Sequence, residues 1–194
     1  MSTKNYLSLG IMTGTSLDGV DLSIIKSDGK NQVIFLDGSS YPFPTNIQKS
    51  IYSILGSSAN NKNIIKIENE YTNFIIKKIK YFLSKNKYKI DLIGFHGQTI
   101  THKPKKKITW QIGNAKKLYE TLKIKTFYDF RSNDVLNGGN GAPLTPIFHK
   151  LLKKKYKISN VVFVNLGGIS NVTIFEKNIM RSFDCGPCCS FSND

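Results

Sequence analysis

The chain of 194 residues is long enough for one sizeable domain, or for one domain and the beginning of a second. Its hydrophobic fraction of 40% and aromatic fraction of 11% are ordinary for a globular protein and exclude a disordered chain. No apolar run is as long as a membrane span, and the N-terminus has no basic region followed by an apolar stretch. We therefore expect neither a membrane protein nor an exported one.

The formal net charge of +15 raises the question of nucleic-acid binding. The basic residues are nearly all Lys, with Arg only at Arg131 and Arg181, whereas base recognition depends on the forked guanidinium of Arg. The Lys residues are also spread over predicted helix faces and loops. A solvated surface explains the charge better than a nucleic-acid partner, and we expect no such partner.

Three cysteines lie close to the end of the chain. Cys185 and Cys188 have the two-residue spacing of zinc and redox sites, and Cys189 follows directly. A structural zinc site needs four ligands, and the three histidines of the chain have no matching spacing. We expect reduced cysteines without a metal, and no metal ion held directly by protein side chains.

The hydrophobic pattern predicts an α/β domain. Short apolar runs separated by turn-rich segments predict an antiparallel meander of strands at residues 6–12, 20–25 and 32–36. A short helix capped by Thr45 or Asn46 follows, and apolar residues at three- and four-residue spacing predict a longer helix over residues 62–85. The remaining predicted elements are strands at 90–95, 108–112 and 125–130 and helices at 115–122 and 145–154.

From residue 160 the opening pattern is repeated. Residues 161–175 read as an apolar strand, a glycine turn with a small hydroxyl residue, and an alternating strand, as at the start of the chain. We therefore expect an N-terminal lobe over residues 1–157 and the incomplete start of a second, similar lobe over residues 158–194.

The turn at residues 14–19 (GTSLDG) combines glycines with hydroxyl side chains between two predicted strands. Glycine lets the backbone N–H groups approach an anion closely, and the hydroxyls add donors. An acidic residue, Asp18 or Asp21, can hold magnesium through water or orient a nucleophile. A plain hairpin explains the same spacing equally well. Residues 167–171 (GGISN) have the same character, and neither segment has the spacing of a P-loop.

Six polar residues follow two predicted strands: His96, Gln98 and Thr99 after the first, and Asp129, Arg131 and Asp134 after the second. Ligands of α/β sheets gather at such strand ends, so these residues are candidates for binding sugar hydroxyls. A hydrogen-bonded structural role explains His96 as well, and Arg131 can simply tie the two acids together. Asp184 precedes a Gly-Pro pair, where a lone Asp is usually a capping residue.

Seven motifs in order resemble those of the anhydro-N-acetylmuramic acid kinase family. They are GIMTGTSLDGVD (10–21), GFHGQTI (94–100), QIGN (111–114), DFR with DV (129–131 and 134–135), GGNGAPL (138–144), VNLGGISNV (164–172) and FDCGP (183–187). The resemblance spans residues 6–187. It implies the two-lobed fold of actin and hexokinase, with a ribonuclease H-like α/β lobe built on a mixed five-stranded sheet with flanking helices, and the first hairpin of a second similar lobe.

The resemblance also implies an activity. The family opens the 1,6-anhydro ring of anhydro-N-acetylmuramic acid with water and phosphorylates O6 with ATP and Mg²⁺, a cytoplasmic step of cell-wall recycling. Asp184 would be the catalytic base, the six polar residues would be candidates for sugar contacts, and a homodimer is compatible with the family. The ATP phosphate loop would comprise Gly14, Thr15, Ser16, Leu17, Asp18, Gly19, Val20 and Asp21, and the second phosphate hairpin Gly167, Gly168, Ser170 and Asn171.

The sequence departs from the family pattern at two places. Thr13 stands where the family usually has Ser, which keeps the hydroxyl. After Pro187 the family continues with Gly-Asn and an apolar helix, whereas this sequence reads CCSFSND and stops. We therefore expect a C-terminally truncated family member. The sequence leaves open whether this chain is active by itself or is an inactive remnant that binds sugar or nucleotide.

Overall fold

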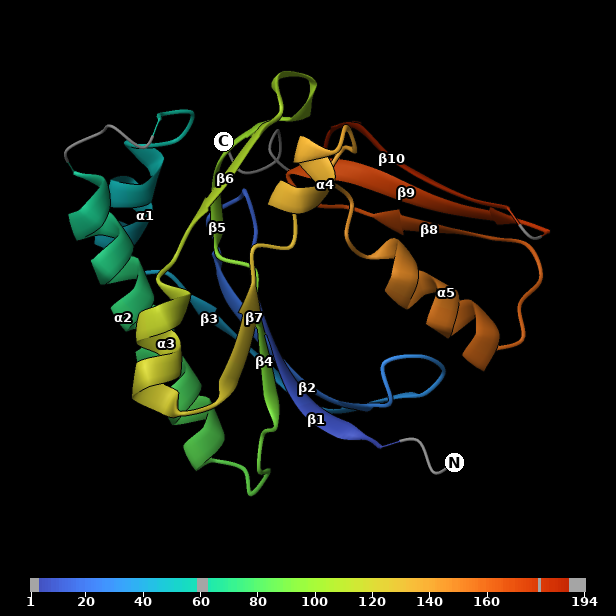
Figure 1. Ribbon diagram of the computed structural model, residues 1–194, viewed down its shortest axis with the longest axis horizontal. Coiled ribbons are helices and arrows are strands. Elements are labelled where there is room, and N and C mark those ends of the chain that lie inside the picture. Colours follow the sequence, from blue (N-terminus) through green and yellow to red (C-terminus); the bar gives the residue numbers. More distant parts are fainter. Residues whose placement is uncertain (1–3, 59–62, 178, 189–194) are drawn as a thin grey trace.

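The computed structural model describes residues 4–58, 63–177 and 179–188. It contains two bodies, a larger one built on a five-stranded sheet and a smaller one built on a three-stranded sheet (Figure 1). Of the features discussed above, Cys189 and the final residues 190–194 lie outside the described residues. No helix in the described ranges has the length and apolar character needed to cross a membrane.

The larger sheet is mixed, as the sequence predicts. Its strand order is β3-β2-β1-β4-β7, in which β1 pairs antiparallel with β2 and parallel with β4. This α/β sheet, a meander followed by two parallel strands, confirms the predicted ribonuclease H-like lobe. The strands are β1 (Tyr6–Thr13), β2 (Gly19–Ser27), β3 (Val33–Pro42), β4 (Leu92–Phe95) and β7 (Lys125–Tyr128).

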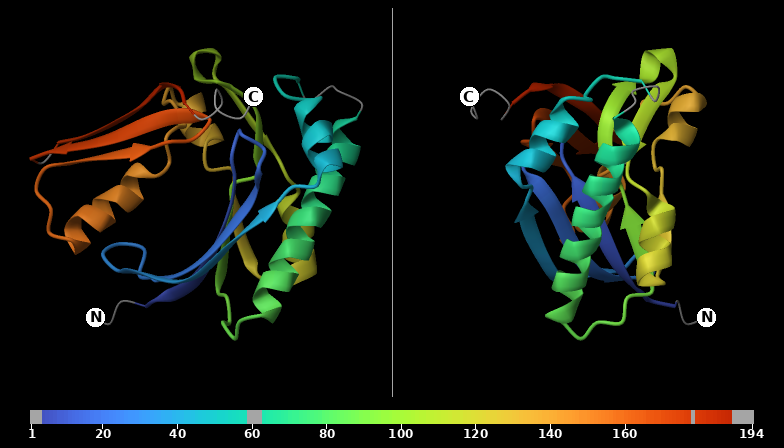
Figure 2. Two further views of the ribbon diagram at one scale, coloured as in Figure 1. Left: turned by 180° about the vertical axis from the view of Figure 1, so that it is seen from behind. Right: turned by 90° about the vertical axis from the view of Figure 1, so that its left-hand side faces the viewer.

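One face of this sheet carries the main core. Alternate residues such as Leu9, Ile11 and Leu22 are buried on that face, because successive side chains of a strand point to opposite sides. The face is covered by helices α1 (Thr45–Tyr52), α2 (Ile64–Ser84) and α3 (Ala115–Leu122) (Figure 2). The predicted apolar stripe of α2 is the buried side of that helix, with Tyr71 fully buried. The predicted cap of α1 is wrong: the N-cap residue is Pro44, and no side chain caps the helix.

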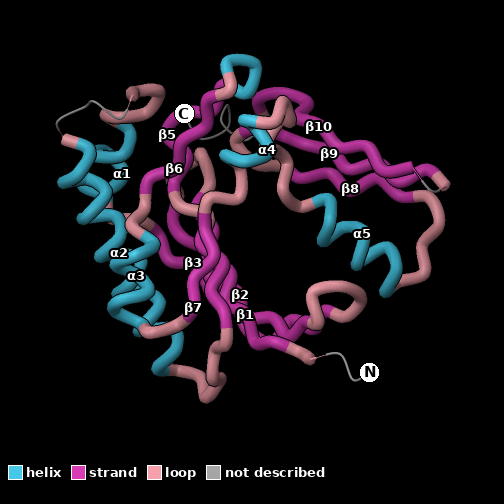
Figure 3. Tube along the Cα trace, in the orientation of Figure 1, coloured by secondary structure: helices cyan, strands magenta, loops and turns pink. Residues whose placement is uncertain are grey.

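The sequence analysis did not predict strand β5 and helix α4 of the larger body. Strand β5 (Gln98–Lys103) pairs with β6 (Ile108–Ile112) across the short 3-10 helix η1 (Pro104–Lys106), and this hairpin extends beyond the end of the larger sheet (Figure 3). The short helix α4 (Ser132–Leu136) follows β7. The apolar–polar alternation of β5 is weak because five of its six residues are polar, so its pairing with β6 determines the strand.

The smaller sheet has the order β10-β9-β8 and is antiparallel throughout. It comprises β8 (Val161–Asn165), β9 (Ile169–Glu176) and β10 (Ile179–Pro187). The predicted hairpin is therefore extended by a third strand, and Asp184 lies inside β10, opposite Asn171, rather than before a turn. Helix α5 (Pro146–Lys155) packs on this sheet, with the His149 ring stacked on Phe163 at 4.5 Å between centroids.

Candidate active site

The two glycine turns meet although they belong to different sheets. Residues 14–18 connect β1 to β2, and residues 166–168 connect β8 to β9. A Cβ atom placed on Gly168 would lie 3.1 Å from Thr15 Oγ1, which is tighter than ordinary packing allows. Glycine at position 168 therefore permits the close approach of the two turns, so the two segments predicted to bind phosphate lie against each other.

The first turn presents unused hydrogen-bond donors. In the described part of the chain, no hydrogen bond engages the backbone N–H groups or the hydroxyls of Thr15 and Ser16, and both residues are exposed. The turn itself is closed by Leu17 N donating to Gly14 O at 3.3 Å, with Leu17 buried and at a φ of 59°. Exposed donors without a hydrogen-bond partner in such a glycine turn suit an anion.

The other residues of the predicted loop have different surroundings. Val20 is fully buried in the core, and Asp18 is exposed. Asp21, on the exposed face of β2, accepts a hydrogen bond from the Ser40 hydroxyl. In the second turn Ser170 Oγ donates to Gly186 O at 3.1 Å, so this hydroxyl braces the turn against β10. The available donors are thus concentrated at Thr15 and Ser16.

The residues that follow β4 form hydrogen bonds to the first turn and to the end of β1. Gln98 is fully buried, and its side-chain Nε2 donates to Gly14 O at 3.1 Å. Thr13 Oγ1 donates to Gly97 O at 3.0 Å and lies 3.1 Å from Tyr71 Oη. These contacts place Gln98 beneath the turn, where it supports the loop rather than faces a ligand.

His96 and Arg131 bind each other. Arg131 Nε donates to His96 Nε2 at 2.9 Å, and His96 Nδ1 lies 2.7 Å from Gly97 O. Burial lowers the pKa of His96 to about 4, and the positive charge of Arg131 acts in the same direction. The imidazole is therefore neutral near pH 7.

Arg131 also holds the glycine-rich loop at residues 137–141. Its Nη1 donates to Gly141 O at 2.6 Å, and Gly141 N donates to Asp134 Oδ2 at 2.7 Å. Any Cβ on Gly139 would overlap the Asp134 carboxylate. Asp134 thus orders this loop, and Asp129 accepts a hydrogen bond from Ser132 N at the start of α4.

Asp184 approaches this group from the smaller sheet. Burial lowers the pKa of Arg131, and the Asp184 carboxylate opposes that effect. Burial likewise lowers the pKa of His102, against the opposing effect of the same carboxylate. No ion pair joins Asp184 to Arg131 among the described residues. Asp184 is exposed on β10, and just after this strand Cys188 N donates to Gly168 O of the second turn at 3.1 Å.

The family comparison agrees with this arrangement. The model that describes anhydro-N-acetylmuramic acid kinases matches residues 6–192, nearly the whole chain. This chain belongs to the anhydro-N-acetylmuramic acid kinase family. The match confirms the resemblance that the seven sequence motifs indicated.

Relatives in the family are considerably longer than this chain. The anhydro-N-acetylmuramic acid kinase of Pelagibacter ubique is 44% identical over 195 residues, which cover 95% of this chain and 52% of that protein. The enzyme of the same description from Zymomonas mobilis is 39% identical, covering 97% of this chain and 55% of that protein. The chain spans about half the length of the curated relatives it matches. The solved structure of the ethanolamine utilization protein EutJ from Carboxydothermus hydrogenoformans covers 97% of this chain and 54% of its own, at 9% identity and a TM-score of 0.43.

A small cavity of about 160 Å³ lies beside His96, between β6 and the end of β7. Of the six residues predicted for sugar contacts, His96 and Asp129 line it. Sequence reasoning missed Trp110, Gln111 and Tyr128, which also line it. The adjacent Trp110 and Gln111 could have indicated this site, because an aromatic ring has an apolar face on which a ligand can pack. Their position beside β7, however, depends on the β5–β6 hairpin, which the sequence analysis did not predict.

The four other predicted sugar residues lie elsewhere. Gln98 is under the first turn, Asp134 holds the glycine-rich loop, and Arg131 is engaged by His96 and Gly141. Thr99 accepts a long hydrogen bond of 3.5 Å from Gln111 Nε2. The structure thus separates residues that are adjacent in the sequence motifs.

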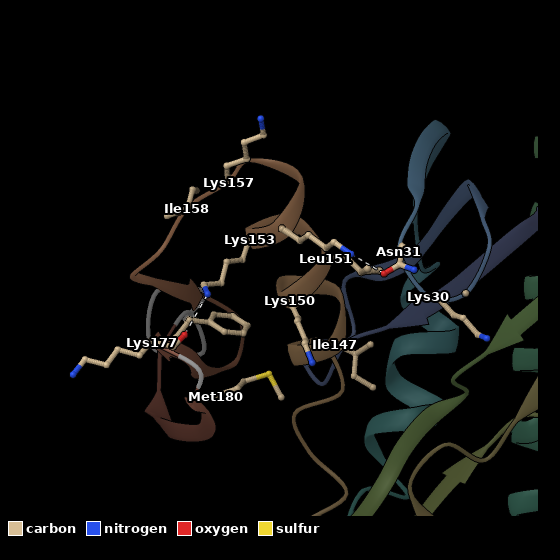
Figure 4. A pocket seen from close by; sticks show the side chains of 13 residues that line it. Lys30, Asn31, Ile147, Lys150, Leu151, Lys153, Lys157, Ile158, Lys177 and Met180 are labelled. Carbon is tan, nitrogen blue, oxygen red and sulfur yellow. Dashed lines mark hydrogen bonds between the residues drawn. The ribbon is translucent and has the colours of Figure 1, made fainter. Parts of the chain in front are cut away.

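A larger hollow among the described residues is lined by none of these groups. It has a volume of about 840 Å³ and lies between the β2–β3 turn, α5 and the β9–β10 turn. Figure 4 shows that Lys30, Lys157 and Lys177 point outward from it, while Lys153 Nζ donates to Lys177 O. None of its lining residues is a predicted site residue, so its size does not make it the active site.

Proposed function

We propose that this chain contributes to the ATP-dependent opening of 1,6-anhydro-N-acetylmuramic acid by water and the phosphorylation of its O6, giving N-acetylmuramic acid 6-phosphate. The observation that carries the proposal is the meeting of the two glycine turns, with the free donors of Thr15 and Ser16 at the contact. Free hydrogen-bond donors beside the contact of two turns suit the phosphate groups of a nucleotide. The ring-opening and phosphorylation reaction itself is inferred from membership of the family, whose model matches residues 6–192.

In this proposal the first turn binds the phosphates of ATP. Gly14 permits close approach of the backbone, and Thr15 and Ser16 donate hydrogen bonds to phosphate oxygens. Bound ATP with Mg²⁺ would supply the phosphoryl group and neutralise its charge. The described residues contain no cluster of three or more His, Cys, Asp or Glu side chains suited to a metal ion, so the metal would arrive with the nucleotide. The donor-rich, exposed turn fits such a ligand.

Asp184 would act as the general base. A carboxylate suits this task, because it accepts a proton from the water that attacks the anomeric carbon. The exposed position of Asp184 on β10, near the contact of the two sheets, gives water access to it. Asn171, opposite Asp184 on β9, and the cavity beside β6 would contribute contacts to the sugar.

The biological setting is part of the same proposal. The substrates would be a small amino sugar and ATP, the reaction would belong to cytoplasmic cell-wall recycling, and a homodimer is compatible with the family. We also propose that the lobe boundary lies near residue 157, with residues 158–194 beginning a second lobe.

The proposal is tested by measuring ADP release from ATP with purified chain and the anhydro-sugar. We expect sugar-dependent release that is lost in Asp184→Asn, because the amide cannot accept the proton, while a Lys150→Gln control in the remote hollow retains it. Calorimetry on the same samples separates the alternatives. Binding of sugar or nucleotide without turnover would support the inactive remnant, and absence of both binding and turnover would contradict the proposed function of this chain.

A further inference from the structure

A further hollow adjoins the first glycine turn on the side of helix α1. It has a volume of about 390 Å³ and lies between the turn and the helix. It shares no lining residue with the cavity beside His96 or with the larger hollow at α5, so it is separate from both. Its described lining residues belong to the turn and to α1 or the residue after it: Ser16, Leu17, Gln48, Lys49, Tyr52 and Ser53.

Hydrogen bonds hold the turn against helix α1. The Leu17 side chain is buried, and its carbonyl accepts a hydrogen bond from Gln48 Nε2 at 3.0 Å. Asp18 O accepts a hydrogen bond from Phe43 N at 3.0 Å, two residues before the helix begins. The turn and α1 therefore have a fixed relative position, and the hollow between them is part of the folded larger body.

The rotation of α1 about its axis brings Lys49 to this hollow. Ile47 and Ile51 are buried on one side of the helix. Gln48 and Tyr52 occupy the neighbouring side, and Lys49 follows next around the axis, because successive residues of a helix are about 100° apart. Among the described residues that line the hollow, Lys49 alone is charged, and no ion pair within the described ranges engages its ammonium group.

Ser16 belongs both to this hollow and to the contact of the two glycine turns. Its backbone N lies 3.9 Å from the position of a Cβ atom on Gly168, and no hydrogen bond in the described part of the chain engages its N–H or hydroxyl. Asp18, two residues along the turn, is exposed and has the wrong charge for a phosphate. A phosphate on the Ser16 donors is therefore stabilised by a cation from another element, and Lys49 lines the same hollow.

We propose that Lys49 is a phosphate-binding residue, and that the nucleotide site extends from the Thr15 and Ser16 donors into the hollow beside α1. The inference rests on the proposed binding of ATP at the first turn. Lys49 Nζ donates to an oxygen of a phosphate group that Ser16 also binds, and its positive charge offsets the negative charge of Asp18. The turn thus supplies the neutral donors for the phosphates, and α1 supplies the cation.

The proposal is tested by calorimetry on the full chain at low ionic strength, with tripolyphosphate and Mg-ATP as separate ligands. We expect Lys49→Gln to weaken the binding of both ligands by about three- to tenfold, because a charge-assisted hydrogen bond is lost. Lys49→Arg keeps the charge and should restore most of the affinity. Lys80→Gln removes an equal charge from an exposed site of α2 outside the hollow and should have little effect. Circular dichroism checks that each variant is folded.

Equal affinities of Lys49→Gln and Lys80→Gln overturn the proposal, because net charge then explains any change. A loss confined to Mg-ATP also overturns it, since Lys49 then contacts the nucleoside and not a phosphate. If the unmodified chain binds both ligands and Lys49→Gln binds them equally well, the role of Lys49 falls and the proposed nucleotide site stands. If the unmodified chain binds neither ligand, the proposed nucleotide site falls as well, so the two failures are distinguished.

Discussion

At the scale of single residues, Gly168 shows most directly how the site depends on a missing side chain. A Cβ atom on Gly168 would lie 3.1 Å from the hydroxyl of Thr15 in the first turn, whereas a Cβ atom on Gly167 would have only ordinary contacts, the nearest at 3.5 Å. Neither glycine has a positive φ. The two neighbours therefore differ in the space around them and not in backbone strain.

We predict that Gly168→Ala weakens ATP binding by about tenfold, since overpacking at such a contact costs about 1–3 kcal/mol and pushes the two turns apart. Gly167→Ala should bind nearly as the unmodified chain does. The measurement is titration with a fluorescent ATP analogue. Equal loss of affinity in both variants would show that the contact with Thr15 is unimportant.

At the scale of elements, buried helix α2 forms hydrogen bonds to the start of α3 and to the end of β1. Glu68 Oε1 accepts from Gly113 N at 2.9 Å and Thr72 Oγ1 accepts from Asn114 N at 3.0 Å, so α2 fixes the entry to α3. One turn along, the Tyr71 hydroxyl meets Thr13 at the end of β1. Burial raises the pKa of Tyr71, which keeps its hydroxyl protonated. Helix α2 thereby connects the core to the end of β1, where the first glycine turn begins.

We predict that Tyr71→Phe lowers the free energy of unfolding by about 1 kcal/mol, because a buried hydrogen bond is lost while the ring remains. Tyr81→Phe on the same helix removes an exposed hydroxyl and should change stability much less. Urea denaturation followed by circular dichroism checks both. If the two variants were equally stable, the contact of Tyr71 with Thr13 would contribute nothing to folding.

At the scale of the whole molecule, the two sheets differ in how their equivalent faces are covered. Leu9 and Ile11 of β1 are buried under helices, whereas Val162 and Val164, which precede the second glycine turn on β8, are more than half exposed. Phe183 lies on the same face, because Val164 pairs with Val172 and Val172 with Phe183. Within the described residues, helix α5 packs on the opposite face, through Phe163 and Thr173. An apolar sheet face of this kind favours self-association.

We predict that Val164→Lys reduces the association of the chain, seen as a lower weight-average mass by light scattering at matched concentration. The charge interrupts the apolar face without entering the core. Ile65→Lys, at an exposed site on α2, adds the same charge elsewhere and should have little effect. If Ile65→Lys reduced the mass as much as Val164→Lys does, net charge would explain the association and the β8 face would not.

Much of the fold could be predicted from local patterns. The opening meander, the long helix α2 and the repeated strand–glycine–strand layout follow from the spacing of apolar residues such as Leu9, Ile11 and Ile75. Strand β5, helix α4 and strand β10 were missed, because their residues are largely polar or lack a clear period and depend on pairing with neighbours. The motifs also predicted a site at Thr15, Ser16 and Gly168, which the structure places close together, but could not separate free hydrogen-bond donors from those already used.

The amino-acid order alone determined the family, the α/β class and the two glycine turns, because these depend on residue types at fixed spacing along the chain. Tertiary structure alone decided that Gln98 hydrogen-bonds to the first turn, that His96 binds Arg131, and that Asp184 lies inside a strand opposite Asn171. The physical reason is that burial and hydrogen-bond partners come from segments far apart in sequence. A polar residue beside a motif can therefore serve as a support or as a ligand contact, and only its three-dimensional surroundings distinguish the two.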